Sequence, residues 1–259
     1  MNRKGLFYKD DGKGHPVLFL HAFPLDLTMW DNTVDACVTA GYRAVRIDLP
    51  GFGNSRGPMV SIAAAAEEVA ALVRALVLEK PFVCGLSMGG YVAFELLRIV
   101  PGLFSGAILC DTNAAADSPG KRADRLATIE MAGTDQFADF VDGFVETLLS
   151  PRAIAGNPEL PFIIRTGFER AGPKAISAAQ RAMANRRSSE DILPGIRIPV
   201  LLMFGEDDPM KDAGADIQNA VEGAEFRLVQ NAGHFSNLEN PADFNQAFLD
   251  FLNRVTIDE

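Results

Sequence analysis

Residues 83–90, Val83-Cys84-Gly85-Leu86-Ser87-Met88-Gly89-Gly90, join a short apolar segment to a Gly-x-Ser-x-Gly motif. Tyr91, Phe94 and Arg98 follow at helical spacing, so the stretch predicts a strand, a tight turn and a helix. This arrangement is typical of a nucleophile elbow, in which the flanking glycines allow so sharp a turn that the serine side chain projects above the sheet. We therefore predict that Ser87 is a nucleophile; the alternative is an ordinary strand-to-helix turn that happens to contain a serine.

An activated serine needs a base, and the chain has three histidines. His15 and His21 flank the first apolar segment, whereas His234 follows the apolar segment Phe226–Val229 near the C-terminus. Catalytic side chains of parallel sheets gather on the loops beyond the strand ends. His234 is the predicted base, and the alternative for it is a solvated loop histidine.

The base in turn needs an acid that orients it. A strongly apolar segment ends in Gly205-Glu206-Asp207-Asp208-Pro209, where neighbouring carboxylates repel one another unless one turns toward a cation or an imidazolium. Asp208 is preferred over its neighbour Asp207. Asp111, which also follows an apolar segment, is a second rival, because the order serine, acid, histidine fits both Asp208 and Asp111.

Several segments together resemble the α/β-hydrolase superfamily. They are Leu20-His21-Ala22-Phe23-Pro24, Asp48-Leu49-Pro50-Gly51-Phe52-Gly53-Asn54-Ser55, Gly85-Leu86-Ser87-Met88-Gly89-Gly90, Gly205-Glu206-Asp207-Asp208-Pro209 and Gly233-His234. The resemblance is closest to small carboxylesterases, cofactor-free haloperoxidase and perhydrolase-type esterases, and 3-oxoadipate enol-lactone hydrolases. It implies a mostly parallel central sheet with helices on both faces and a helical cap insertion. In such proteins the acid lies three residues after the strand-ending glycine, which from Gly205 implies Asp208.

The resemblance also implies an oxyanion hole formed by the backbone N–H groups of Phe23 and Met88. Donors aimed at a developing oxyanion contribute about 3 kcal/mol each to acyl transfer. The family usually has glycine where this chain has Ala22, so a positive φ at that position would strain the loop. His21 is expected to hold the loop by hydrogen bonds rather than to act as a second base.

Composition favours one enzyme-sized α/β unit. With 259 residues, 48% of them hydrophobic, the chain can bury a large core. A formal net charge of −10 argues against nucleic acid and anionic membranes as partners. The sequence lacks a secretory apolar core and any run of about 20 apolar residues, and its three scattered cysteines indicate buried thiols in a reducing compartment. These features predict a cytoplasmic protein.

Cofactor and metal chemistry are not indicated. The chain lacks His-x-x-x-His and paired-cysteine spacings, so no metal site is predicted. Gly51-Phe52-Gly53 lacks the third glycine of a dinucleotide-binding loop and is interpreted as a turn. No cofactor is expected, and the sequence carries no signal for an oligomeric state.

The strand pattern stops between residues 114 and 193, where prolines separate several short helices. We therefore expect a first core part at 1–113, a helical cap at 114–193 and a second core part at 194–259. Six cap residues recur at helical spacing and predict an amphipathic helix: Phe137, Phe140, Val141, Phe144, Val145 and Leu148. The stripe either docks the helix on the core or, with Phe162 and Phe168, roofs an apolar acyl pocket. The pocket candidates are Phe137, Phe140, Phe144 and Phe162.

The sequence thus predicts a serine hydrolase that cleaves a small carboxylic ester or lactone through an acyl-enzyme intermediate. Ser87 would attack the carbonyl, His234 would move the proton, and Asp208 would orient the imidazole. An enol-lactonase or C–C bond hydrolase with the same triad is the nearest alternative, and peracid formation is a conceivable side activity. A non-catalytic ligand receptor on the same fold is the alternative from another functional class.

Overall fold

Apolar segments separated by helical patterns become the strands of one sheet in the computed structural model, which describes residues 5–257. The strands of this part are β1 (Tyr8–Gly12), β2 (Pro16–Leu20), β3 (Arg43–Ile47), β4 (Phe82–Leu86), β5 (Gly106–Cys110), β6 (Val200–Gly205) and β7 (Glu225–Val229). They lie in the order β1-β3-β2-β4-β5-β6-β7, with β1 antiparallel to β3 and the remaining neighbours parallel. This topology confirms the predicted mostly parallel sheet.

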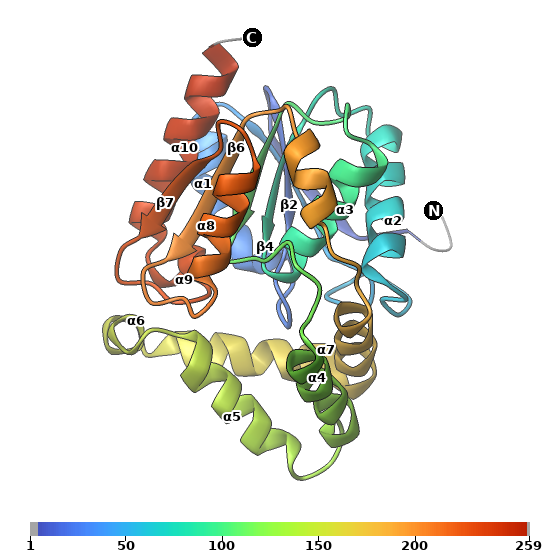
Figure 1. The fold of residues 1–259 in the computed structure, drawn as a ribbon. Helices are drawn as coiled ribbons and strands as arrows, with labels where there is room; N and C mark the ends of the chain where they lie inside the picture. The colour runs from blue at the N-terminus through green and yellow to red at the C-terminus, as the bar shows by residue number, and fades with distance from the viewer. Residues whose placement is uncertain (1–4, 258–259) are drawn as a thin grey trace.

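Helices cover both faces of the sheet (Figure 1). The core helices are α1 (Asp31–Thr39), α2 (Ile62–Ala75), α3 (Met88–Ile99), α8 (Lys211–Ala220), α9 (Ser236–Glu239) and α10 (Pro241–Ile257), with the 3-10 helix η1 (Leu27–Trp30) before α1. Because both faces are covered, every residue of β4, β5 and β6 is buried. The uninterrupted apolar runs of these strands in the sequence have this physical origin.

The segment between β5 and β6 is largely helical. Its α-helices lie beyond the sheet, on the lower side in Figure 1, whereas its final 3-10 helix returns to the core beside α8. It contains α4 (Pro119–Met131), α5 (Phe137–Leu148), α6 (Pro151–Gly156), α7 (Glu159–Ala184) and the 3-10 helix η2 (Glu190–Gly195). α7 is kinked at Gly172, which has φ 69° and precedes Pro173. The four α-helices, here called the insertion, span Pro119–Ala184, and α5 spans the predicted amphipathic stripe. The 3-10 helix η2 ends at Gly195, beyond the predicted boundary at residue 193.

The short basic pair Arg186-Arg187 joins the insertion to the core. Arg187 donates to both carboxylate oxygens of the buried Glu95 on α3, at 2.8 and 2.7 Å. Arg186 lies over the Tyr91 ring, 4.0 Å from its centroid, and pairs with Asp117. Both arginines are therefore engaged within the protein rather than forming a free basic patch.

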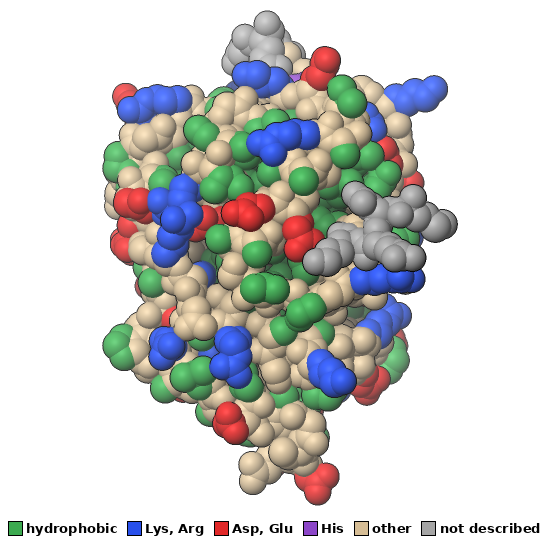
Figure 2. Space-filling view, turned by 90° about the vertical axis from the view of Figure 1, so that its right-hand side faces the viewer, with side chains coloured by type: hydrophobic (Ala, Val, Ile, Leu, Met, Phe, Trp, Pro, Cys, Tyr) green, Lys and Arg blue, Asp and Glu red, His purple; other side chains and the backbone are tan. Residues whose placement is uncertain are grey.

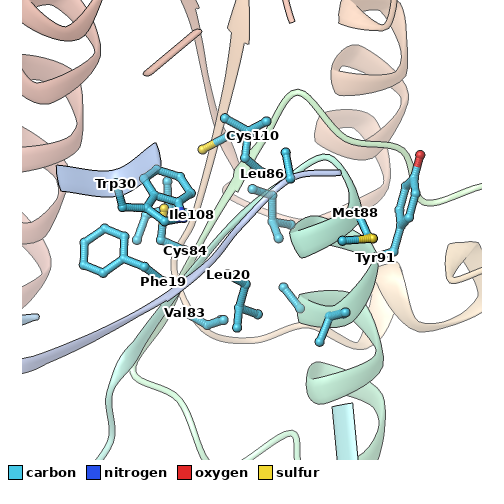
Figure 3. Close-up of a cluster of buried hydrophobic side chains, with 14 of the residues drawn as sticks. Phe19, Leu20, Trp30, Val83, Cys84, Leu86, Met88, Tyr91, Ile108 and Cys110 are labelled. Atoms are coloured by element: carbon cyan, nitrogen blue, oxygen red, sulfur yellow. The ribbon is translucent and has the colours of Figure 1, made fainter. Parts of the chain in front are cut away.

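The sheet separates two layers of apolar side chains. Figure 3 shows Phe19 and Trp30 on one side of β2 and β4, and Met88 and Tyr91 on the other. Phe19 packs on Trp30 and on Phe248 of α10, with ring centroids 5.3 and 5.7 Å apart. Successive strand residues point to opposite faces, so one strand supplies both layers.

The outer surface is mixed in character. On the face seen in Figure 2, hydrophobic side chains are scattered among acidic and basic ones. None of the helices described here combines the length and apolarity needed to cross a lipid bilayer.

α3 begins in very close contact with the sheet. Ser87, between β4 and α3, has φ 52° and ψ −110°, a conformation that a non-glycine residue rarely adopts. A Cβ atom at Gly85 would lie 2.5 Å from the carbonyl oxygen of Gly89, and one at Gly89 would lie 2.1 Å from the carbonyl oxygen of Leu20. Only glycine therefore fits at these two positions of the motif.

We expect Gly89→Ala to lower the free energy of unfolding by about 2–4 kcal/mol, because a backbone oxygen blocks the added methyl group. Gly143→Ala is the matched control. Its added Cβ meets nothing within 4 Å on α5, and helix propensity predicts a gain of about 0.5–1 kcal/mol. Urea unfolding of both variants measures the difference, and wild-type stability of Gly89→Ala would contradict the close approach of α3 to β2.

Candidate active site

Three side chains from distant parts of the chain form one hydrogen-bonded series. Oγ of Ser87 lies 2.9 Å from Nε2 of His234, and Nδ1 of His234 lies 3.0 Å from Oδ1 of Asp208. Ser87 follows β4, Asp208 lies on the loop after β6, and His234 lies on the loop after β7. The fold thus brings together the serine, base and acid that the sequence singled out.

The acid end of the series is sealed from solvent. Asp208 and His234 are 1% and 3% exposed. Burial alone would raise the pKa of Asp208, but the adjacent His234 and the hydrogen bonds donated by His234 and by the backbone N–H of Met210 hold that pKa below its usual value. Asp208 is therefore ionised at neutral pH and can stabilise an imidazolium.

The two rival acids lie elsewhere. Asp207 is exposed and gives no side-chain contact to His234. Asp111 is buried behind Asp208, where its carboxylate accepts from the backbone N–H of Gly205 and from the hydroxyl of Ser236. The hydrogen bond to Nδ1 of His234 therefore distinguishes Asp208 from both.

Glu239 organises the histidine loop. Its half-buried carboxylate accepts from the backbone N–H groups of Gly233 and Phe235, on either side of His234, at 2.8 and 3.0 Å. It also accepts from the N–H of Ser150 in the insertion at 2.8 Å. Burial raises the pKa of Glu239. No role for Glu239 was predicted from the sequence, because an isolated glutamate after a loop is usually solvated.

The loop after β2 carries the first predicted oxyanion donor. Within residues 5–257, neither the backbone N–H of Phe23 nor that of Met88 donates to a protein acceptor, so both are available to a ligand. Met88 opens α3, where the N–H groups lack intrahelical partners and the helix dipole favours negative charge. Ala22 does not have positive φ, so the strain that its side chain could have caused is absent.

His21 holds this loop in place. Nε2 of His21 accepts from the backbone N–H of Leu49 at 2.9 Å, and Nδ1 donates to the carbonyl oxygen of Ala22 at 3.0 Å. Burial lowers the pKa of His21 and keeps it neutral. With both ring nitrogens occupied by backbone groups, His21 has the structural role expected from the sequence.

An aromatic cluster lies between the insertion and the loop after β2. The Phe168 ring is at its centre, 5.5 Å from Phe23 and 5.1 Å from Phe144. Phe137 and Phe140 contact Phe168 at 5.7 and 5.9 Å. Three of the four predicted pocket residues are therefore grouped around Phe168.

Phe162 lies apart from this cluster. Its side chain is 64% exposed and borders a separate cleft with Leu25 and Leu238. Phe162 was singled out as an aromatic residue of the insertion, but the sequence pattern could not show which side of α7 it occupies. Phe168, only 2% exposed, is the aromatic residue of α7 that meets Phe23.

Acidic and sulfur-containing side chains do not converge into a metal centre. Within the part of the chain described, no group of three or more His, Cys, Asp or Glu side chains could hold a metal ion. Cys37, Cys84 and Cys110 are buried free thiols, and burial raises the pKa of Cys37 to about 12.

Comparisons with known proteins identify the family to which this fold belongs. Residues 17–247 match the model of the alpha/beta hydrolase family. The chain is 32% identical to a thermophilic esterase from Thermogutta terrifontis, with a TM-score of 0.91, over 96% of this chain and 93% of that one. It is 25% identical to the enol-lactonase from Burkholderia xenovorans, with a TM-score of 0.86 and 96% of each chain covered. A non-heme chloroperoxidase of Kitasatospora aureofaciens is 26% identical over 96% of both sequences.

We expect Asp208→Asn to slow covalent labelling of Ser87 by a fluorophosphonate about 10⁴-fold, because the asparagine side chain stabilises the wrong imidazole tautomer. Labelling measures activation of the serine without any assumption about substrate. Asp207→Asn is the matched control and should label at the wild-type rate, since Asp207 is exposed and outside the series. Equal rates for Asp208→Asn and the wild type would remove Asp208 as the acid.

Proposed function

The chain belongs to the alpha/beta hydrolase family and is a hydrolase, and we propose that it cleaves small carboxylic esters or lactones through an acyl-enzyme intermediate. The observation that carries this proposal is the series from Oγ of Ser87 through the imidazole of His234 to Oδ1 of Asp208. An alcohol becomes nucleophilic when an oriented base takes its proton, and this series supplies both the base and the group that orients it.

The proposed reaction has two halves. Oγ of Ser87 attacks the substrate carbonyl while Nε2 of His234 takes the proton, and the imidazolium then gives that proton to the leaving alkoxide. In the second half His234 removes a proton from water, which attacks the acyl-enzyme. The imidazolium then returns that proton to the departing Oγ of Ser87 as the acid is released. The backbone N–H groups of Phe23 and Met88 would bind the oxyanion in both halves. The chemistry uses only these groups and calls for no cofactor.

The proposed substrate class follows from the relatives and from the surroundings of Ser87. A solved esterase and a solved enol-lactonase are both similar to this chain over nearly its whole length. Phe144 and Phe168 pack against Phe23, whose N–H is one of the proposed oxyanion donors. Aromatic side chains at that position favour an apolar acyl group. We propose that the insertion acts as the cap and supplies one wall of this acyl pocket.

We expect Ser87→Ala to lower kcat for a p-nitrophenyl ester by at least about 10⁴-fold while leaving the melting temperature near that of the wild type. The wild type should complete many turnovers. A ligand receptor on this fold would release at most one equivalent of p-nitrophenol for each molecule of protein. More than a tenth of wild-type activity in Ser87→Ala would rule out the proposed nucleophile.

We expect Phe144→Ala to move the acyl preference toward longer chains, because removing the ring opens space beside Phe23 and Phe168. It should also cost about 3 kcal/mol of stability. The measurement is kcat/KM for esters of two to ten acyl carbons. Phe162→Ala, at the exposed phenylalanine outside the cluster, is the control and should leave the preference unchanged. An unchanged acyl-chain preference in Phe144→Ala would mean that α5 only packs the insertion against the core and does not line the acyl pocket.

A further inference from the structure

Asp111 is a buried carboxyl group that the proposed reaction does not use. It directly follows β5, is 0% exposed and has φ 46°, a left-handed conformation that aspartate tolerates better than most residues. Its Oδ1 accepts from the backbone N–H of Gly205 at 2.9 Å, and its Oδ2 accepts from the hydroxyl of Ser236 at 2.5 Å. The carboxyl group thus links the ends of β5 and β6 with the start of α9.

Asp208 has one carboxylate oxygen that no N–H or hydroxyl group satisfies. Oδ1 of Asp208 accepts from Nδ1 of His234 and from the N–H of Met210. Oδ2 is buried and, among the described residues, receives no hydrogen bond from any such donor. Besides His234, the side chain within hydrogen-bonding reach of the Asp208 carboxylate is Asp111. A hydrogen bond between two carboxyl groups requires that one of them keeps its proton.

The charges around Asp111 decide which group keeps it. The groups that face Asp111 are Asp208 on the loop after β6, Cys110 on its own strand and Ser236 on α9, and His234 lies beyond Asp208. None of the described lysines or arginines forms an ion pair with Asp111. Burial, followed by the negative charge of Asp208, raises the pKa of Asp111 well above its usual value, whereas His234 favours the charge on Asp208.

We propose that Asp111 is a neutral carboxylic acid that donates a hydrogen bond to Oδ2 of Asp208 and thereby positions the acid of the triad. The positioning role depends on the proposed function, because it assumes that Asp208 is the acid of the triad. The protonation of Asp111 does not, because it follows from the burial of the two carboxyl groups next to each other. With both Asp208 oxygens bonded, the carboxylate plane is fixed toward Nδ1 of His234. The pair also carries a single negative charge beside the imidazole, because the second proton is retained.

The first test measures protonation without measuring activity. A carboxyl group whose pKa is raised by folding stabilises the protein fully below its unfolded pKa of about 3.9, and this contribution is lost as the pH rises toward the pKa in the folded state. Asp111→Asn carries no proton equilibrium. We therefore expect the unfolding equilibrium constant of the wild type, divided by that of Asp111→Asn, to rise about tenfold per pH unit above about pH 5. A ratio that stays constant from pH 5 to 8 means that Asp111 is ionised and overturns the proposal.

The second test measures positioning. Asparagine keeps a donor that can reach Oδ2 of Asp208, whereas leucine has a similar volume and no donor. We expect fluorophosphonate labelling of Ser87 to be at least tenfold faster in Asp111→Asn than in Asp111→Leu. Equal rates in the two variants overturn the positioning role, whether both are fast or both are slow. If Asp111→Leu does not fold, the pH dependence of the ratio between the unfolding equilibrium constants of the wild type and Asp111→Asn decides the proposal alone.

The two tests also separate this inference from the proposed function. If the wild type fails to turn over esters, the proposed function is wrong, yet the stability ratio still reports the proton on Asp111. If esters are turned over and the ratio is constant with pH, the function stands and the inference about Asp111 fails.

Discussion

The contact between the start of α3 and the end of β2 is the constraint on which the candidate active site depends. The absence of a side chain at Gly89 lets α3 approach until a Cβ would lie 2.1 Å from the carbonyl oxygen of Leu20. Because the chain continues from Leu20 into the loop that carries Phe23, this approach brings that loop beside the first turn of α3. The N–H of Met88 already adjoins Ser87 in the chain, and this packing brings the loop that carries Phe23 to the same end of α3. A looser contact would move Ser87 and the Met88 N–H together away from the loop that carries Phe23.

Buried and half-buried carboxylates hold the loops at the carboxyl end of the sheet. Asp48 accepts from the N–H groups of Leu27 and Asn54, and Glu239 accepts from three backbone N–H groups around the histidine loop. Each buried acid is costly to desolvate, and donated backbone hydrogen bonds offset that cost. These acids thus fix loop backbone that forms no helical or sheet hydrogen bonds of its own. Asp111 also accepts hydrogen bonds that hold strand ends and a loop together, but it lies next to a second carboxyl group, Asp208. In the proposed arrangement a proton retained on Asp111 forms the hydrogen bond between the two groups.

The sequence predicted the sheet, the elbow and the insertion because each has a local signature. Buried parallel strands are continuous apolar runs, and the elbow needs glycines at fixed positions. The edge strand β1 (Tyr8–Gly12) was not predicted, because its charged residues lie half exposed beside β3 and carry no apolar run. Local patterns also could not give the structural role of Glu239 or the contact of Asp111 with Asp208. Asp111 and Asp208 are more than 90 positions apart in the chain. The contacts of Glu239 join loops whose course depends on the assembled sheet.

The insertion is fixed to the catalytic loop at one edge, and this limits how it can influence the reaction. The backbone N–H of His234 donates to the carbonyl oxygen of Leu148 at 2.8 Å, and Glu239 binds the N–H of Ser150. A Cβ at Gly233 would lie 2.6 Å from the same Leu148 oxygen, so the two backbones are in direct contact. Displacing the end of α5 would therefore displace His234 as well. Variation that preserves the triad is better accommodated by the ring positions of Phe137, Phe140 and Phe144 than by movement of the segment 148–150. Substrate choice on this scaffold is thus expected to change through side chains on α5 and α7, with the backbone next to the histidine loop held constant.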